Sequence, residues 1–145
     1  MDNAIVEGAN GGLHTNYAGK MQAAADALLR DGYDFAYIHV EAPDEMGHQG
    51  SVERKVQAIE YLDERVIRYV KEAMDASGED YRMLILPDHP TPIEVRTHTN
   101  EPVPYLLYDS TKVQNRTWEY SEKCAKEGGI YHPQGHKLID CLFEA

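Results

Sequence analysis

Three short apolar runs along the chain have the length and composition of β-strands. The first covers residues 35–40, the second 83–86, and the third 103–108, where Pro104 stands near the start and a missing backbone N–H is tolerated. Each run is rich in aliphatic and aromatic side chains and is followed by a polar residue or a proline. This pattern predicts strands that are buried in a sheet.

Apolar side chains recur at helical spacing before and between these runs. A first helix is expected from Thr15 or Asn16, either of which can cap it, to about residue 28. The longest helix is expected over residues 51–76, with Ser51 as its N-cap and Gly78 just beyond its last turn. Its apolar positions recur every three or four residues and predict a face that packs on a sheet. They are Val52, Val56, Ile59, Leu62, Val66, Tyr69 and Ala73.

Two shorter helices are expected later in the chain, one over residues 121–126 and one from Gly135 to Cys141. Strands that alternate with helices are typical of an α/β fold with a mainly parallel sheet and flanking helices. A chain of 145 residues has the size of one domain and is long enough to bury a core. We therefore expect a single α/β domain over residues 1–145.

The charge balance narrows the classes of partner. The chain has 25 acidic and 14 basic residues, which gives a formal net charge of −11. This balance argues against nucleic acid or an anionic membrane as the main partner, because both need clustered lysine and arginine. A small phosphorylated substrate remains compatible, since bound divalent cations invert the local charge.

Cysteine usage and hydropathy indicate the compartment. Cys124 and Cys141 are far apart and form no zinc-type pair, so a single disulfide stays open and a reduced, cytoplasmic protein is the simpler interpretation. No apolar run approaches the length of a membrane span, and residues 1–3 do not begin a secretory leader.

Five residues carry the candidate chemistry. Asp44 and His48 are expected in a loop after the first apolar run, Asp88 and His89 in a turn after the second, and His98 in the polar loop after them. Carboxylate oxygens and imidazole nitrogens together suit a hard-to-borderline divalent cation. Ligand sites in open α/β sheets lie beyond the carboxyl ends of strands, so these residues predict a metal site at one edge of the sheet. Taken singly, each residue also fits a surface polar or turn-forming role.

The other polar candidates favour structural roles. His39 lies inside an expected strand, and His14, His132 and His136 lie beside glycine or proline turns. No serine or cysteine stands in a recognisable nucleophile motif such as Gly-x-Ser-x-Gly.

The same residues carry a resemblance to a known family. The stretches 41–50 (Glu-Ala-Pro-Asp-Glu-Met-Gly-His-Gln-Gly), 87–92 (Pro-Asp-His-Pro-Thr-Pro) and 96–104 resemble the archaeal-type cofactor-independent phosphoglycerate mutases of the alkaline phosphatase superfamily. The stretch 8–20 and Gly135–His136 are also similar to the C-terminal part of that family. The resemblance extends over essentially the whole chain and implies part of an alkaline-phosphatase-like core.

The resemblance implies a role for each candidate ligand. Asp44, His48 and His98 would bind one metal ion, and Asp88 and His89 would help to bind a second. In the family, an aspartate and a nucleophilic serine from the first half of the polypeptide complete the second site, and the metals are typically manganese or zinc. The family interconverts 2- and 3-phosphoglycerate through a phosphoserine.

This chain departs from the family in length, because nothing in it matches the N-terminal aspartate segment, the serine segment or the cap domain. It resembles only a C-terminal portion, so we expect the isolated chain to be inactive and to keep metal best at Asp44, His48 and His98. A homodimer, or pairing with a separate N-terminal half, is a further expectation, since missing strands leave an unpaired sheet edge. Two alternatives stay open: a fragment of a homoserine kinase-like phosphotransferase of the same superfamily, and a non-catalytic binding or assembly module.

Overall fold

The computed structural model describes residues 2–112 and 119–143. The chain divides into two compact units. The first unit contains residues 1–79 together with 91–98, and the second contains residues 80–90 together with 99–145. In the part of the chain that the structure describes, no helix is both long and apolar enough to span a bilayer.

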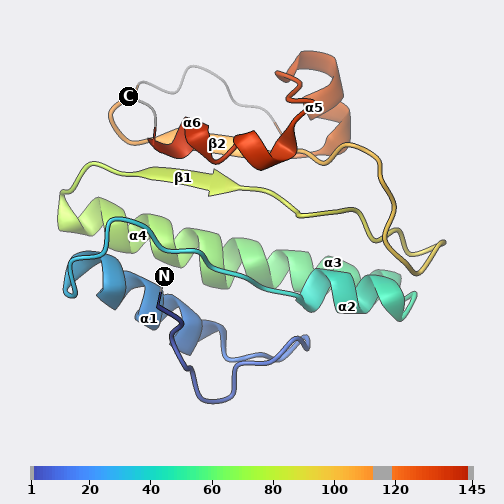
Figure 1. The fold of residues 1–145 in the computed structure, drawn as a ribbon. Coiled ribbons are helices and arrows are strands. Elements are labelled where there is room, and N and C mark those ends of the chain that lie inside the picture. The colour runs from blue at the N-terminus through green and yellow to red at the C-terminus, as the bar shows by residue number, and fades with distance from the viewer. Residues whose placement is uncertain (1, 113–118, 144–145) are drawn as a thin grey trace. The chain divides into compact units, whose positions relative to one another are not determined.

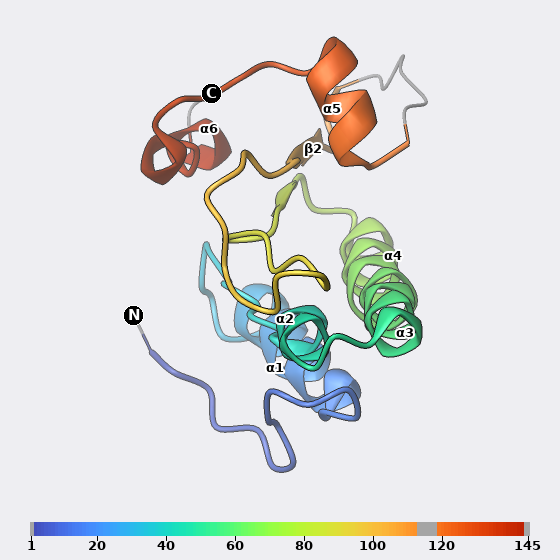
Figure 2. The same ribbon diagram turned by 90° about the vertical axis from the view of Figure 1, so that its right-hand side faces the viewer.

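The first unit is built from helices. They are α1 (Tyr17–Leu29), α2 (Ala42–His48), α3 (Val52–Leu62), the π-helical turn η1 (Asp63–Ile67) and α4 (Arg68–Ser77). Helices α3, η1 and α4 run end to end as one long helix (Figure 1). Helix α1 packs against η1 and α4, and α2 packs against α3 (Figures 1 and 2).

Local capping explains where these helices begin and end, as the sequence predicted. The Asn16 side chain accepts a hydrogen bond from the Gly19 N–H, and the Ser51 side chain accepts one from the Arg54 N–H. Gly78 follows α4 in the left-handed conformation, with φ of 74°, which glycine adopts without steric cost. The predicted helix over residues 51–76 is therefore confirmed, although its middle turn is a π-helix.

Two small cores hold the helices of the first unit together. Ala42 of α2 and Ala58 of α3 are fully buried, and their small side chains let the two helices approach closely. Leu13 and Met46 complete this core. The second core contains Tyr17 and Met21 of α1 and Val66 of η1, packed together with neighbouring aliphatic side chains.

The predicted apolar face of the long helix is only partly buried. Val66 is 7% exposed, but Val52, Val56 and Ile59 near the start of the helix are 63%, 49% and 52% exposed. The prediction that these three residues pack on a sheet is wrong for the described residues. Helix α3 instead turns the side that carries Ala58 toward α2.

Residues 35–40 do not form a strand. This segment has no ladder partner among residues 2–112 and 119–143, where the sheet contains only β1 and β2. Its alternation is nevertheless that of a strand: Ile38 and Val40 pack against the helical cores, whereas Tyr37 is 68% exposed. The apolar run predicted a buried strand here, but a strand also requires a neighbour to pair with.

The sheet of the second unit has two strands, β1 (Arg82–Ile85) and β2 (Leu106–Asp109). They pair antiparallel, with Arg82 opposite Asp109 and Ile85 opposite Leu106. The α/β character is confirmed, but this pairing differs from the predicted parallel sheet. Parallel neighbours need a long crossover, usually a helix, and the fully described segment 86–105 contains none.

The predicted helices after β2 are present in modified form. Ser121 caps α5 (Glu122–Gly128), and the last predicted helix is divided into a 3₁₀ turn, Gly135–Lys137, and α6 (Asp140–Phe143). Cys124 and Cys141 are both free thiols. Asp109 is buried and forms an ion pair with Arg82 across the two strands, at 2.9 Å between Oδ2 and Nε.

Candidate metal centre

Helix α2 positions the first two candidate ligands. We predicted a loop for Asp44 and His48, but both lie on α2, with Pro43 in the first turn, where its missing N–H is tolerated. Four residues apart on a helix, the two side chains lie on the same face. Asp44 Oδ2 is 3.2 Å from His48 Nε2, and both side chains are about one-third exposed.

Residues 91–98 bring the third ligand to the same place within the first unit. His98 Nε2 lies 3.3 Å from Asp44 Oδ1 and 3.2 Å from His48 Nε2. The two imidazole rings are tilted by 46° with their centroids 5.1 Å apart. Within the described residues, this is the one group of three or more His, Cys, Asp or Glu side chains whose ligand atoms lie within 4.8 Å of one another.

A hydrogen bond fixes the chemistry of His48. Its Nδ1 lies 2.9 Å from the carbonyl oxygen of Arg96, which can only accept, so Nδ1–H is the donor. In neutral His48 the lone pair is then on Nε2, the atom that faces Asp44 and His98. Metal-binding histidines are oriented in this way, with the second ring nitrogen donating to a carbonyl or a carboxylate.

The three ligand atoms fit a divalent cation. Two ligands about 2.1 Å from one ion in tetrahedral geometry lie roughly 3.4 Å from each other. His48 Nε2 lies 3.2 Å from Asp44 Oδ2 and 3.2 Å from His98 Nε2, close to this value, whereas the distance of 3.3 Å from His98 Nε2 is to the other Asp44 oxygen, Oδ1. The lone pair of neutral His48 Nε2 faces a carboxylate and another ring nitrogen, so either an N–H of His98 or a bound metal ion can meet it. The oxygen and nitrogen donors suit zinc or manganese.

Two residues that the sequence did not indicate, Thr91 and Lys55, hold Asp44 in place through hydrogen bonds. The Thr91 hydroxyl donates to Asp44 Oδ1, and the Lys55 ammonium donates to the Thr91 carbonyl at 2.5 Å. Gly47 allows this contact, since a Cβ atom there would lie 2.6 Å from the Thr91 carbonyl oxygen. A glycine inside a helical motif is a sequence signal for close backbone approach, whereas neither Thr91 nor Lys55 carries such a signal.

Asp88 and His89 form a separate pair in the second unit. The backbone N–H of His89 donates to Asp88 Oδ1 at 3.1 Å, and the ring Nε2 of His89 lies 3.4 Å from Asp88 Oδ2. No third carboxylate, imidazole or thiol of the described chain completes this pair as a metal-binding group.

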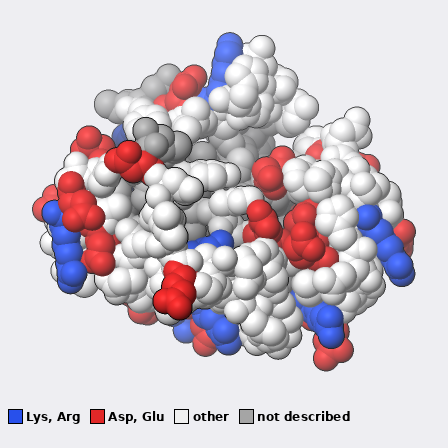
Figure 3. Space-filling view, turned by 60° about the horizontal axis from the view of Figure 1, so that its bottom comes forward, with Lys and Arg blue, Asp and Glu red and all other residues white. Residues whose placement is uncertain are grey.

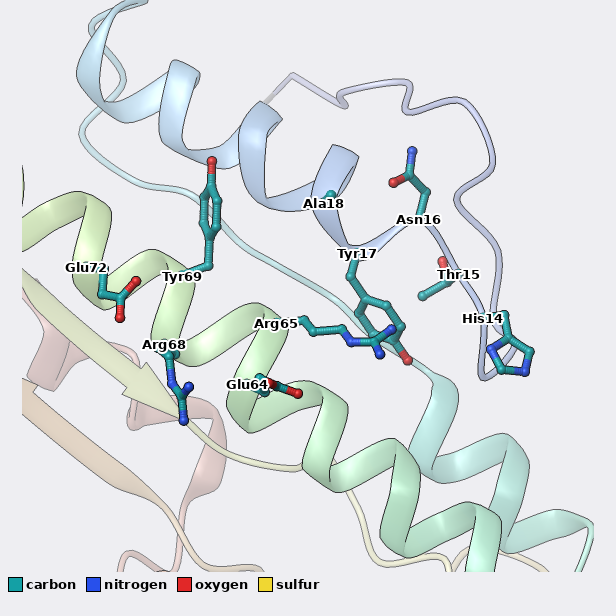
Figure 4. A pocket seen from close by; sticks show the side chains of 10 residues that line it. All are labelled: His14, Thr15, Asn16, Tyr17, Ala18, Glu64, Arg65, Arg68, Tyr69 and Glu72. Atoms are coloured by element: carbon teal, nitrogen blue, oxygen red, sulfur yellow. The ribbon is translucent and has the colours of Figure 1, made fainter.

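A hollow of about 580 Å³ lies elsewhere in the first unit, between the start of α1 and the η1–α4 stretch (Figure 4). The Arg65 guanidinium stacks over the Tyr61 ring, 3.5 Å from its centroid, and lies 5.9 Å from the centroid of Tyr17. Glu64 and Glu72 balance the two arginines that line the hollow, so its charge selects no class of ligand.

On the face of the molecule that Figure 3 shows, acidic side chains lie at several places with lysine and arginine side chains among them. The net charge of −11 gives a surface that attracts cations in general. The specificity of the candidate site therefore has to come from the convergence of Asp44, His48 and His98 and not from the overall charge.

Comparison with known proteins agrees with this chemistry. The 2,3-bisphosphoglycerate-independent phosphoglycerate mutase of Methanothrix thermoacetophila is 47% identical over 94% of this chain and 34% of its own length. The protein of the same name from Methanosarcina mazei is 41% identical over 100% of this chain and 36% of its own length. The solved structure of the PH0037 protein from Pyrococcus horikoshii matches 98% of this chain and 42% of its own, with a TM-score of 0.77 and 30% identity.

The chain therefore spans about a third of the length of the curated relatives it matches. Residues 1–144 match the metalloenzyme superfamily. On this match, over nearly its full length, the chain belongs to the metalloenzyme superfamily.

Proposed function

We propose that Asp44, His48 and His98 bind a divalent cation, manganese or zinc, and that this site serves a phosphoglycerate mutase. The observation that carries the proposal is the convergence of one ligand atom from each of the three residues, all within 4.8 Å of one another. The hydrogen bond from Nδ1 to the Arg96 carbonyl leaves His48 Nε2 as the acceptor. Three protein ligands leave room for a water or a substrate oxygen, as in catalytic zinc sites.

Asp88 and His89 are proposed as ligands of a second metal ion. Both side chains offer ligand atoms on one turn of the chain. By the resemblance to phosphoglycerate mutases, the remaining ligands are an aspartate and the nucleophilic serine. Both would come from the part of those enzymes that this chain does not match. On this proposal the pair binds metal weakly in the isolated chain.

The proposed reaction is the interconversion of 2- and 3-phosphoglycerate through a phosphoserine. Support comes from relatives that carry the name phosphoglycerate mutase and match 94% to 100% of this chain. Bound divalent cations would supply Lewis-acid stabilisation of charge on the attacking and leaving oxygens. Two groups of this chain orient the ligands. The Thr91 hydroxyl orients the Asp44 carboxylate, and the Arg96 carbonyl orients the His48 ring. Without the serine, the isolated chain would not transfer phosphoryl groups.

We further propose that both units belong to one α/β domain with an alkaline-phosphatase-like core, cytoplasmic like other glycolytic enzymes. Residues 36–40 lie outside the β1–β2 sheet, and their side chains alternate between packed and exposed as in a strand, so this segment is the proposed place for pairing with an added strand. Polypeptide equivalent to the part of the relatives that this chain does not match is the proposed source of that strand. The alternative is pairing with a second copy of the chain. Measurement of the molecular mass in solution distinguishes a dimer from a monomer.

A chimera tests the activity. In the Methanothrix relative, the region that matches this chain is replaced by the chain itself, and conversion of 2-phosphoglycerate is measured with manganese or zinc. We expect mutase activity that is lost with Asp44→Ala and kept with Asp34→Ala, which changes an exposed aspartate outside the site. A folded chimera without mutase activity, or one that stays active with Asp44→Ala, would contradict the proposal.

A further inference from the structure

Arg96 has an unusual backbone conformation beside the candidate metal centre. With φ of 58°, it is the one non-glycine residue in the left-handed region among residues 2–112 and 119–143. A long side chain with a Cβ atom rarely adopts this conformation, because the Cβ atom crowds the following carbonyl. Such outliers persist where surrounding contacts enforce them, and they concentrate at functional sites.

A backbone hydrogen bond of Arg96 holds this conformation, and the Arg96 side chain lies beside the end of α2. The backbone N–H of Arg96 donates to the Pro92 carbonyl at 2.8 Å and closes the turn over residues 92–96. Its guanidinium lies against Gly50, just beyond the C-terminal end of α2, where a Cβ atom would come within 2.5 Å of Arg96 Nε. The turn is therefore fixed to the same helix end that carries His48.

This arrangement directs the carbonyl group of Arg96 toward the His48 ring. The carbonyl accepts the proton of His48 Nδ1 at 2.9 Å, and this bond leaves the lone pair of neutral His48 on Nε2. Only Nε2 faces Asp44 and His98, so the opposite tautomer would present a proton to the candidate metal position.

We infer that Arg96 is a positioning residue whose left-handed backbone selects the metal-binding tautomer of His48. The inference rests on the proposed metal site, but the residue acts in the metal-free chain as well. The requirement is for the backbone conformation and not for the guanidinium charge. Residue types that tolerate positive φ should therefore substitute for arginine, and β-branched residues should not.

Four single variants separate the effect of the backbone conformation at residue 96 from the effect of the guanidinium. Arg96→Gly and Arg96→Asn remove the guanidinium but accept positive φ, whereas Arg96→Val and Arg96→Ile remove it and resist positive φ. Two quantities are measured for each: the His48 tautomer in the metal-free chain by long-range ¹H–¹⁵N NMR, assigned with His48→Gln, and the affinity for Mn²⁺ and Zn²⁺ by calorimetry.

We expect the glycine and asparagine variants to keep the Nδ1–H tautomer and to bind metal within a few-fold of the wild type. The valine and isoleucine variants should show mixed tautomers and lose roughly 10- to 100-fold in affinity, the usual effect of losing a partner that orients a ligand. A folded glycine variant with the Nε2–H tautomer, or valine and isoleucine variants equal to wild type in both measurements, would overturn the inference. A wild type that shows the expected tautomer but binds no metal would instead refute the proposed function.

Discussion

Replacement of Gly47 by alanine tests how tightly α2 is joined to residues 91–98. The added Cβ would lie 2.6 Å from the Thr91 carbonyl oxygen and 3.0 Å from both Thr91 Cγ2 and Lys55 Nζ, where ordinary contacts begin at 3.4 Å. The carbonyl must therefore retreat by 3.4 − 2.6 = 0.8 Å. Thr91 is buried and its carbonyl is held by Lys55, so it cannot retreat without moving its neighbours.

Two opposing effects decide the sign of the stability change. Alanine in a helix interior is favoured over glycine by about 1 kcal/mol, whereas overpacking a tight contact costs about 1–3 kcal/mol. The shortfall of 0.8 Å against backbone places Gly47→Ala at the high end of that cost. We expect a net loss of roughly 1–2 kcal/mol in the free energy of unfolding, and roughly 10- to 100-fold weaker metal binding because Thr91 and His98 move together.

Urea unfolding followed by circular dichroism and calorimetry with Mn²⁺ and Zn²⁺ measure the two effects of Gly47→Ala. Gly135→Ala is a matched control, since no atom lies within 4 Å of the added Cβ there. A Gly47→Ala chain that is about 1 kcal/mol more stable than wild type and binds metal equally well would refute the reasoning. It would mean that residues 91–98 do not pack on α2 in solution.

Two further predictions concern the second unit and its pH dependence. Hydrogen bonds from Thr111, together with Arg82 and Lys112, hold the pKa of Asp109 well below its ordinary 3.8, so the stability that its charge provides is present above pH 3.8 and is lost as the pH falls further. Asp109→Asn should lower the unfolding midpoint at neutral pH and flatten this acid limb, and an unchanged acid limb would contradict the assignment. Burial raises the pKa of Tyr120 from 10.0 to about 12, and its hydroxyl donates to the Pro104 carbonyl. Stability should therefore fall as the pH rises from 10 to 12. Tyr120→Phe should lose about 1 kcal/mol at pH 7 and show a smaller alkaline loss than wild type; an alkaline loss equal to that of wild type would argue against the contact.

The sequence predicted those parts of the fold that are set locally. The caps at Asn16 and Ser51 and the glycine stop at Gly78 act within a few residues, so the helix limits followed from them. Strand pairing is not local. The pattern of residues 35–40 predicted a buried strand, and only part of the segment is packed against the helices. No pattern within a segment specifies its partner or the antiparallel direction of β1 and β2.

The residues of the candidate site also divide into those that the sequence indicated and those that only the folded structure brings together. Asp44 and His48 stand four residues apart, and such a spacing brings two side chains together on a helix, although a loop was predicted there. His98 is 50 residues from His48. The sequence pattern grouped it with all four other candidates, and only the family resemblance assigned it to the same metal ion as Asp44 and His48. The Thr91 hydroxyl and the left-handed Arg96 depend on tertiary contacts, so the sequence carried no signal for either.

X-ray absorption spectroscopy of the chain with one equivalent of Zn²⁺ tests the central claim most directly. The account predicts two imidazole nitrogens and a carboxylate oxygen at about 2.0–2.2 Å in the wild type. It predicts one imidazole fewer in His98→Ala and no change in His89→Ala, whose ring belongs to the separate pair with Asp88. A spectrum without imidazole, or one that loses an imidazole in His89→Ala but not in His98→Ala, would contradict the account.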